Sequence, residues 1–481
     1  MIRKWLPVAC VAAGVVAVGG VALGLAEKSK HIEVDAAQVP QLTEEQADQL
    51  ASMVLANKCA ACHGSNPTYS TLLNIGSLGL MARHVAGAQR SFTLEPDESV
   101  RPALTNVLKI DYTLSARRMP PISYTMAHWG SALTEGDVAL LRRVFATDQA
   151  QTAITPIEPV AEPTDAVAAA KIQLGHLLFN DPRLSTNNRV ACASCHTLTK
   201  GGTDNLPKSE GVPGADGKPQ LGGVNAPTVF NAEKRIRQFW DGRAADLKEQ
   251  AGGPPLNPVE MGYEHPEDWA KIAAKLQQDP ELVALFGYVY PQGGITGDTI
   301  TDAIAAYEKT LVTPDSAFDR YLKGDAEALT PQQKAGYEAF RSHGCITCHS
   351  GSTMGGASFE YINTFADLRE AAAPASYEES AYGLFDFTKK EQHRDLFRVP
   401  TLRNVALTKP YFHTGSVQSL EEAVRIMFKT QCDRSVSTET VQAVTAFLEA
   451  QTGKLNGKPL NELTAQDVAP QHKPLPTSAG E

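Results

Sequence analysis

The 481-residue chain lacks three features, and each absence excludes a class of protein. It has no excess of basic residues, since 44 Lys and Arg face 54 Asp and Glu, for a net charge of −10. Without a basic stripe to neutralise phosphates, a nucleic acid is not expected as a partner. Only Cys10 and Cys432 of the eight cysteines lie outside one recurring motif, so no disulfide framework is visible. Alternating strand patterns are scarce, which predicts a mainly α-helical fold.

The recurring motif is Cys-x-x-Cys-His, the attachment signature of c-type haem. Its three copies are Cys59–Cys62–His63, Cys192–Cys195–His196 and Cys345–Cys348–His349. The two thiols can form thioethers to the haem, and the imidazole that follows can reach the iron. A zinc site or a redox dithiol is the alternative, but zinc needs four ligands, typically from two Cys-x-x-Cys pairs close together. Because these pairs are far apart, we predict three covalent haems with His63, His196 and His349 as axial ligands.

One long apolar run without charged residues covers positions 5–26 and follows Arg3 and Lys4. It is long enough to cross a lipid bilayer as a helix, with its positive end on the cytoplasmic side. A cleaved signal peptide is the alternative, because small residues stand near position 26 at the spacing of a cleavage site. The run is long for a signal peptide, so we expect an uncleaved anchor. Both readings export the rest of the chain.

The haem motifs divide the chain into similar units. We expect three cytochrome c-like haem domains in tandem after an N-terminal transmembrane helix. The predicted boundaries are a stub and anchor at 1–26, a tether at 27–41, an N-terminal haem domain at 42–151, a proline-rich linker at 152–165, a second haem domain at 166–325, a third at 326–452 and a tail at 453–481. Capping boxes at Thr43 and Thr330 predict the helices that lead to Cys59 and Cys345. A further helix is expected to begin at Asp165.

The ligand opposite each axial His decides what a haem can do, because His–Met ligation gives an electron carrier, whereas an open position can bind an oxidant. For the first haem, Met119 lies in a Met-Pro loop, and its rivals are Met81, Met126, His84 and His128. For the third haem, Met427 lies on an expected helix, where packing beside Val424 and Phe428 is the alternative. The loop after the middle motif contains neither Met nor His, so we expect the middle haem to be open.

Two polar residues downstream of the middle motif could act on an oxidant. Gln250 and Glu260 lie in a stretch rich in Gly and Pro, where backbone can approach a cofactor closely. A carboxylate above an open haem can take a proton from one peroxide oxygen and return it to the other. Taken alone, Glu260 is more simply a surface carboxylate.

Between residues 165 and 451 the sequence resembles the bacterial dihaem cytochrome c peroxidases. The motifs that carry the resemblance are "LLFNDPRLS", "CASCH", "NAPTVFNA", "QFWDGRAADL", "NPVEM" and "PTLRNVALTKPYFHTGS". The resemblance implies that His196 holds the peroxidatic haem and His349 the electron-transferring haem, whose second ligand is Met427. It also implies that Gln250 and Glu260 are the distal catalytic pair.

Further site residues follow from the same resemblance. Trp240 matches the tryptophan between the two haems, and His413 matches a histidine near the haem propionates. One calcium ion is implied between the haem domains, with ligands at Asn225, Thr408 and Pro410. A homodimer is an open expectation. A relative of this fold that modifies protein tryptophans uses Tyr in place of Met427, so Met427 favours a peroxidase.

The sequence departs from the family in the loop after the middle motif. Many members carry a distal His there, which blocks the peroxidatic haem until the other haem is reduced. An ungapped count from the motif places Val212 at that position. Because valine cannot bind iron, we predict that no reductive activation is needed.

The whole chain is similar to the membrane-anchored trihaem quinol peroxidases. We therefore expect an enzyme that reduces hydrogen peroxide, anchored by residues 5–26 in the bacterial inner membrane with its haem domains in the periplasm. Its electrons are expected from membrane quinol or from a small c-type cytochrome. The alternatives are a multihaem electron carrier without a catalytic site and a soluble peroxidase fed by small cytochromes.

Overall fold

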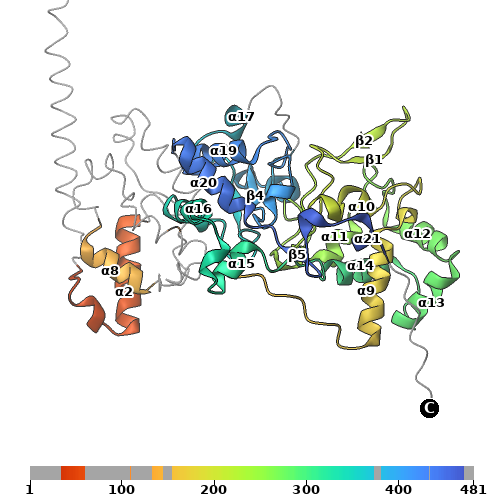
Figure 1. Ribbon diagram of the computed structural model, residues 1–481, viewed down its shortest axis with the longest axis horizontal. Helices are drawn as coiled ribbons and strands as arrows, with labels where there is room; N and C mark the ends of the chain where they lie inside the picture. Colours follow the sequence, from red (N-terminus) through yellow and green to blue (C-terminus); the bar gives the residue numbers. More distant parts are fainter. Residues whose placement is uncertain are drawn as a thin grey trace, which may run out of the picture. The chain divides into compact units, whose positions relative to one another are not determined.

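The computed structural model describes residues 34–59, 109, 133–144, 154–372, 381–432 and 434–470 (Figure 1). The chain divides into two units, residues 1–153 and 154–481. Within the described ranges, no helix is both long and apolar enough to cross a membrane. The predicted anchor at 5–26 and the stub before it lie outside the described residues. The division of the second unit into two haem domains stays a prediction.

Helices dominate the described parts of both units, which confirms the mainly α-helical fold. The first unit contains a 3-10 turn at Val39–Gln41, α2 (Glu44–Val54), a π-helical turn at Leu55–Cys59 and α8 (Glu135–Val144). The helices of the second unit are α9 (Ala166–Phe179), α10 (Cys192–Cys195), α11 (Leu247–Gly252), α12 (Trp269–Leu276), α13 (Pro280–Val289), α14 (Gly297–Glu308), α15 (Ala317–Leu322), α16 (Pro331–Ser342), α17 (Leu368–Ala371), α18 (Leu384–Thr388), α19 (Leu420–Cys432), α20 (Thr438–Glu449) and α21 (Ala465–Val468).

The strands of the described residues form three antiparallel pairs, each of two short strands. The pairs are β1 (Glu210–Pro213) with β2 (Pro219–Leu221), β3 (Phe359–Tyr361) with β4 (Leu396–Arg398), and β5 (Lys454–Leu455) with β6 (Lys458–Pro459). Two-stranded ribbons cannot form a core of their own, so these strand pairs depend on the helical framework.

The predicted helix starts are confirmed. Thr43 and Thr330 each accept a hydrogen bond from the third helical residue and complete a capping box, and they begin α2 and α16. Asp165 caps α9 by accepting a hydrogen bond from the amide of Ala168 at 2.8 Å. Each cap satisfies an amide that the first helical turn leaves unpaired. Two of these helices, α2 and α16, lead directly into a Cys-x-x-Cys-His motif.

Two helix pairs of the second unit pack in the same manner. Helix α9 lies against α14, and α16 lies against α20 (Figure 1). In each pair a glycine of the first helix stands where a Cβ atom would be 1.9 Å from a carbonyl oxygen of the second helix. These glycines are Gly175, facing Ala303, and Gly336, facing Ala443. Only glycine permits the helices to approach so closely, so each pair has a contact that the sequence specifies.

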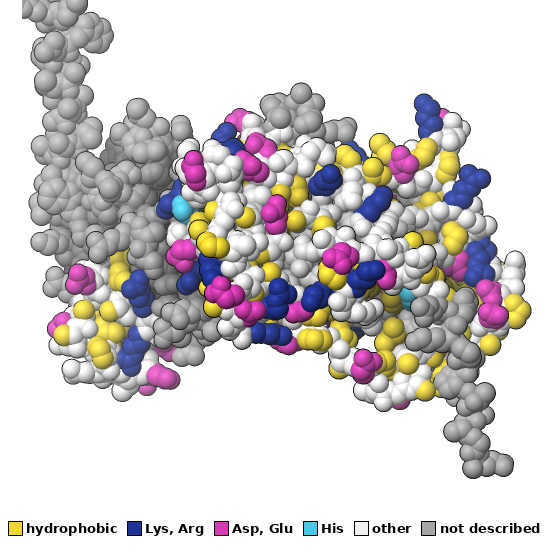
Figure 2. Space-filling model, in the orientation of Figure 1, with side chains coloured by type: hydrophobic (Ala, Val, Ile, Leu, Met, Phe, Trp, Pro, Cys, Tyr) yellow, Lys and Arg dark blue, Asp and Glu magenta, His cyan; other side chains and the backbone are white. Residues whose placement is uncertain are grey.

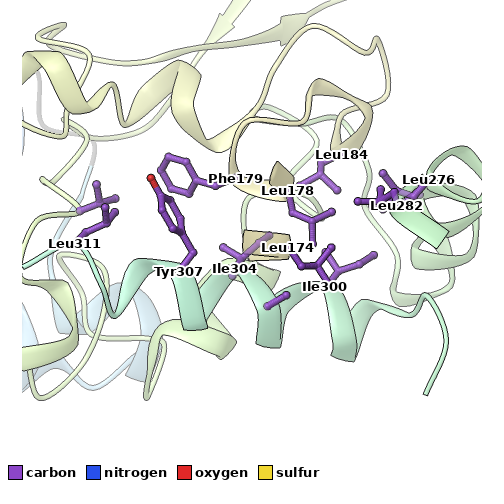
Figure 3. Packing of buried hydrophobic residues seen from close by; sticks show 14 of the residues in the cluster. Leu174, Leu178, Phe179, Leu184, Leu276, Leu282, Ile300, Ile304, Tyr307 and Leu311 are labelled. Atoms are coloured by element: carbon purple, nitrogen blue, oxygen red, sulfur yellow. The ribbon is translucent and has the colours of Figure 1, made fainter. Parts of the chain in front are cut away.

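The largest buried cluster surrounds α9 and α14. Its side chains include Leu174, Leu178, Phe179, Leu184, Leu276, Leu282, Ile300, Ile304, Tyr307 and Leu311 (Figure 3). Phe179 and Tyr307 lie next to each other (Figure 3), in an edge-to-face contact whose ring centroids are 5.4 Å apart. Val212, from β1, and Met261 also belong to this cluster. The loops that carry them are therefore attached to the same core as the helices.

An aromatic cluster holds α16 and α20 together. Phe318 makes edge-to-face contacts with Tyr337 and Phe447, each with ring centroids 4.9 Å apart. Phe340, one turn before the third haem motif, lies 5.4 Å from Phe447. Aromatic pairs of this geometry contribute energy beyond the area they bury. The cluster therefore fixes the end of the helix from which Cys345 follows.

The surface charge of the described residues is mixed in sign. On the face shown in Figure 2, Lys and Arg side chains are interspersed with Asp and Glu over the second unit. Many form exposed ion pairs, such as Arg394 with Glu391 at 2.6 Å. Pairs of this kind contribute little to stability.

Candidate haem centres and catalytic residues

The middle motif forms a single helical turn, α10, that presents Cys192 and Cys195. His196 follows, and its Nδ1 donates a hydrogen bond to the carbonyl oxygen of Gly202 at 3.4 Å. Burial lowers the pKa of His196, so the ring is neutral at physiological pH. With Nδ1 engaged, Nε2 is left to bind a metal, which is the arrangement an axial haem ligand needs.

The third motif repeats this arrangement. Cys345 begins a 3-10 turn after α16, and His349 Nδ1 donates to the carbonyl oxygen of Met354 at 3.1 Å. Burial lowers the pKa of His349 to about 4. Nε2 is again the candidate ligand atom. The two motifs therefore share one design, in which a carbonyl a few residues later orients the imidazole.

A cavity of about 240 Å³ lies at the third motif. Its wall includes Cys345, Cys348, His349 and Met427. Helix α19 carries Met427, half-buried, into the same cavity. Two thiols, an imidazole and a thioether around one cavity fit a covalent haem with His–Met ligation. The role of Met427 as the axial ligand stays a prediction.

Glu260 is a half-buried carboxyl group held by its own loop. Asn257 Nδ2 donates to Glu260 Oε1 at 2.9 Å, and Asn257 Oδ1 accepts from the amide of Val259 at 3.0 Å. Burial raises the pKa of Glu260, while the charge of Arg243 and the Asn257 amide oppose that rise. The negative charge of Glu260 also contributes to raising the pKa of the Cys195 thiol, after burial as the main cause.

The loop after the middle motif forms the β1–β2 hairpin. The amide of Val212 donates to the carbonyl oxygen of Glu260 at 2.9 Å, and the Val212 side chain is buried. Gln220 reinforces this contact, since its Nε2 donates to the carbonyl oxygens of Val212 at 3.3 Å and Pro258 at 3.2 Å. These hydrogen bonds thus connect the hairpin to the segment that carries Glu260.

Gln250 lies half-buried on the short helix α11. Its backbone carbonyl accepts from the amide of Gly253 at 3.0 Å. No hydrogen bond joins the Gln250 and Glu260 side chains among the residues that the structure describes. Their action as a catalytic pair therefore stays a prediction.

Trp240 belongs to an aromatic group at the cavity of the third motif. Its Nε1 donates to the carbonyl oxygen of Asn225 at 2.9 Å, which fixes the ring. The ring lies 6.5 Å from Phe397 and 6.2 Å from His413, edge to face in both cases. His413 stacks on Phe397 at 4.3 Å and is fully buried. The contact of His413 with a haem propionate stays a prediction.

The residues predicted to bind calcium lie close together in space. Asn225, Thr408 and Pro410 all line the cavity of the third motif. Asn225 Nδ2 donates to the carbonyl oxygen of Leu206 at 2.8 Å, which leaves the amide oxygen as its potential ligand atom. Calcium binding stays a prediction.

The first motif lies at the edge of the described residues. Cys59 ends the π-helical turn after α2, and Lys58 before it forms a buried ion pair with Asp137 at 2.5 Å. The other predicted haem ligands of this unit lie outside the described residues; they are Cys62, His63 and Met119, together with the rivals Met81, Met126, His84 and His128.

The sequence analysis did not predict three features of these sites. Asn257 orients Glu260, and its signal was an Asn-Pro pair three residues before a carboxylate. Arg235 and Arg398 are buried on the cavity wall of the third motif, and no local pattern indicates this. Cys432, which had no explanation, lines the same cavity within hydrogen-bonding reach of Cys345.

Comparisons with known proteins bear on these sites. A model of the di-haem cytochrome c peroxidase family matches residues 169–327. The cytochrome c peroxidase Ccp of Escherichia coli K12 is 39% identical over 448 residues, which cover 89% of this chain and 91% of the relative. The chain belongs to the dihaem cytochrome c peroxidase family. It is therefore a haem peroxidase with haem c cofactors, and the motif to which each haem is attached stays a prediction.

Other comparisons extend this result for the dihaem peroxidase. The cytochrome c551 peroxidase of Nitrosomonas europaea is 42% identical over 313 residues, covering 65% of this chain and 89% of that protein. A crystal structure of a MauG-like protein associated with microbial copper homeostasis is 28% identical, with a TM-score of 0.52, over 62% of this chain and 93% of that one. A haem-binding domain model matches residues 18–147, so the first unit resembles a haem-binding domain as well.

Proposed function

We propose that this dihaem peroxidase reduces hydrogen peroxide to water at the haem held by Cys192, Cys195 and His196. The observation that carries the proposal is Glu260, a half-buried carboxyl group whose Oε1 accepts a hydrogen bond from Asn257 Nδ2 at 2.9 Å and whose backbone carbonyl accepts from Val212, in the hairpin after the middle motif. When bound, the haem iron supplies the redox chemistry that breaks the O–O bond.

The residues of the chain handle the protons. Glu260 accepts a proton from one oxygen of peroxide and delivers it to the other, which then leaves as water. Burial raises the pKa of Glu260, which makes the group a better base than an exposed carboxylate. Gln250 orients the peroxide through its side-chain amide. The β1–β2 hairpin keeps the Glu260 backbone in place during this exchange.

The enzyme takes peroxide without prior reduction. Val212, at the position expected for a distal His, has an apolar side chain packed in the core around α9 and α14, and its backbone is bonded to Glu260. A reorganisation that brings a ligand from this hairpin to the middle haem would have to break both contacts. The resting enzyme should therefore give a high-spin ferric spectrum, and only low-spin haems would contradict this.

The electron supply uses two further haems. We propose that the first unit binds the third haem, through Cys59, Cys62, His63 and Met119. This unit receives electrons from membrane quinol or from a small c-type cytochrome. The match to a haem-binding domain and the alignment with the E. coli relative across most of the chain support this arrangement. Residues 5–26 anchor the enzyme in the inner membrane, and the haem domains face the periplasm. One calcium ion at Asn225, Thr408 and Pro410 joins the two haem domains of the second unit.

Peroxide turnover with a quinol and with a reduced cytochrome tests the proposal. Glu260→Gln keeps the shape and removes the base, so turnover should fall by about 10²–10⁴-fold with either donor. Glu267→Gln, which changes an exposed carboxylate, is the matched control and should retain activity. Full turnover in Glu260→Gln would overturn the site. The absence of turnover in the wild type with every donor would favour an electron carrier without a catalytic site.

A further inference from the structure

Two arginines are buried on one wall of the cavity at the third motif. Arg235 is 8% exposed and Arg398 is 1% exposed, and both line the cavity that contains Cys345, Cys348 and His349. Arg235 comes from the segment before Trp240, whereas Arg398 ends β4. Buried guanidinium groups are rare, because desolvation of a charge is costly unless an opposite charge compensates it.

Backbone carbonyl groups hold both arginines in place. Arg235 Nη2 donates to the carbonyl oxygens of Thr228 at 2.6 Å and Phe230 at 3.2 Å. Arg398 Nε donates to the carbonyl oxygen of Phe239 at 3.0 Å. These bonds fix the positions of the guanidinium groups but bring no negative charge. The Nε of Arg235 has no hydrogen-bond partner among the described residues.

The nearby carboxylates do not neutralise this pair. Burial lowers the pKa of Arg235 well below its usual value, and the charge of Arg398 lowers it further. Burial likewise lowers the pKa of Arg398 to about 10. Glu308 is close enough to oppose the shift of Arg235, but burial raises its own pKa to about 8. Glu308 therefore carries little charge at neutral pH, and Asp241 is engaged by Arg243 at 3.0 Å.

A ligand that brings its own carboxylates fits this wall. A haem is an apolar disc with two propionate groups on one edge. The thioether bonds to Cys345 and Cys348 determine where the opposite part of the disc lies. Guanidinium groups form short, charge-assisted and often bidentate hydrogen bonds with carboxylates. Arg235 still has an unused donor, Nε, for such a bond.

We propose that Arg235 and Arg398 bind the propionates of the haem attached to Cys345 and Cys348. The propionate edge of this haem then faces the wall that also contains Trp240, so it points toward the part of the unit that holds the middle motif. The inference depends on haem attachment at the third motif and is independent of where peroxide is reduced.

The proposal has an electrostatic consequence for this haem. A nearby positive charge stabilises the reduced form, which carries one positive charge less than the oxidised form. Removal of Arg235 should therefore lower the reduction potential of this haem. The loss of a propionate partner should not prevent haem attachment, because the thioethers are made by Cys345 and Cys348.

The experiment compares two arginines that lie two positions apart. Arg235→Met removes a buried charge at the cavity, whereas Arg237→Met removes the same charge from a half-buried side chain that donates to the carbonyl oxygen of Arg243 at 3.2 Å. Haem potentials of the full-length, haem-loaded protein are measured by spectroelectrochemical titration, and haem content is measured per chain. Met427→His identifies the haem of the third motif, because that substitution should alter its spectrum.

The expected result is a lower potential of that haem in Arg235→Met, with full haem content and no shift in Arg237→Met. Arg235→Lys should recover part of the potential, because it restores the charge without the planar fork. The proposal is overturned by equal shifts in Arg235→Met and Arg237→Met, by no shift in either, or by a shift confined to another haem. If Arg235→Met does not fold, Arg235→Lys tests the proposal instead. An unchanged reduction potential of the third-motif haem in Arg235→Lys, together with unchanged propionate vibrations in its resonance Raman spectrum, would contradict a specific contact between Arg235 and a propionate.

Discussion

The backbone amide of Val212 donates a hydrogen bond to the carbonyl oxygen of Glu260 across 2.9 Å. The bond connects the hairpin after the middle haem motif to the residue proposed to move protons. Its neighbour Gly211 makes the contact possible, because a Cβ atom there would lie 2.0 Å from the carbonyl oxygen of Val259 and 2.8 Å from that of Glu260. The geometry of the catalytic loop thus depends on a residue without a side chain.

Gly211→Ala should displace this loop. A methyl group at this position meets backbone, which cannot move aside as a flexible side chain can, so we expect a loss of roughly 1–3 kcal/mol in stability. Peroxide turnover should fall as well, because Glu260 moves with the loop. Gly223→Ala is the control, since a Cβ atom there meets nothing within 4 Å. Thermal melting and turnover measure both effects, and equal behaviour of the two variants would contradict the role of Gly211.

Asn257→Asp should change the pH dependence of the reaction. The variant keeps the Oδ1 atom that accepts from the Val259 amide, but it replaces the donor to Glu260 with a second carboxylate oxygen. The lost hydrogen bond and the added negative charge both raise the pKa of Glu260. Because Glu260 must be deprotonated to accept the first proton, the acid limb of kcat/KM should move to higher pH, by about 1–3 units.

The neutral variant Asn257→Ser separates the two causes. It lacks the amide donor but adds no charge, so its acid limb should move in the same direction by less. Both variants are measured from pH 4 to 8 with the wild type in parallel. If the acid limb stays in place in Asn257→Asp while turnover falls, Asn257 has only a structural role.

Glu308 should make the enzyme less stable as the pH rises. Burial raises its pKa from 4.5 to about 8 in the folded chain. The folded state therefore binds the proton more tightly than the unfolded state. The associated stability is fully present below pH 4.5 and is lost as the pH rises through about 8, with a slope of up to about 1.4 kcal/mol per pH unit.

Glu308→Gln should remove this dependence, because the amide does not titrate. Its melting temperature should exceed that of the wild type at pH 8 and approach it at pH 5. Glu281→Gln, on an exposed carboxylate, should follow the wild type across the whole range. Parallel melting curves for Glu308→Gln and the wild type between pH 5 and 8 would rule out the buried carboxyl group as the cause.

Arg403 and Asp319 form a buried ion pair that should be essential for stability. Their side chains are 3.0 Å apart and each is 1% exposed. Asp319 Oδ1 also accepts a hydrogen bond from the amide of Ile157, and Arg403 Nη2 donates one to the carbonyl oxygen of Thr155. The ion pair therefore holds the segment before α9 in place. Arg403→Met leaves a buried carboxylate without its partner and should cost about 3–5 kcal/mol in chemical denaturation.

The matched comparison is an exposed pair. Arg394→Met removes the partner of Glu391 at the surface and should cost less than about 1 kcal/mol. The double variant Arg403→Met Asp319→Asn should recover part of the loss, because no charge then remains buried. Additive losses in the double variant would show that the two side chains do not act as a pair.

Short-range patterns predicted a large part of the fold. The caps at Thr43, Asp165 and Thr330 were readable because each involves residues within four positions of one another. The same holds for the Cys-x-x-Cys-His motifs, whose chemistry depends on adjacent side chains. The pairing of the hairpin after the middle motif with the Glu260 segment was not predicted, because it joins distant positions. The burial of Arg235 and Arg398 at the cavity of the third motif was missed for the same reason, because no pattern of neighbouring residues indicates that an Arg is buried.

The amino-acid sequence by itself predicted where the haems attach, and it determined which helices lead to the Cys-x-x-Cys-His motifs and which peroxidase family the chain belongs to, because each of these depends on neighbouring residues or on shared motifs. The tertiary structure alone decided which carbonyl oxygen orients each imidazole, that Asn257 and Val212 hold Glu260, and that Arg235 and Arg398 share a cavity wall. Burial and long-range hydrogen bonds arise only when distant segments pack together, and these interactions set the pKa and the position of each functional group.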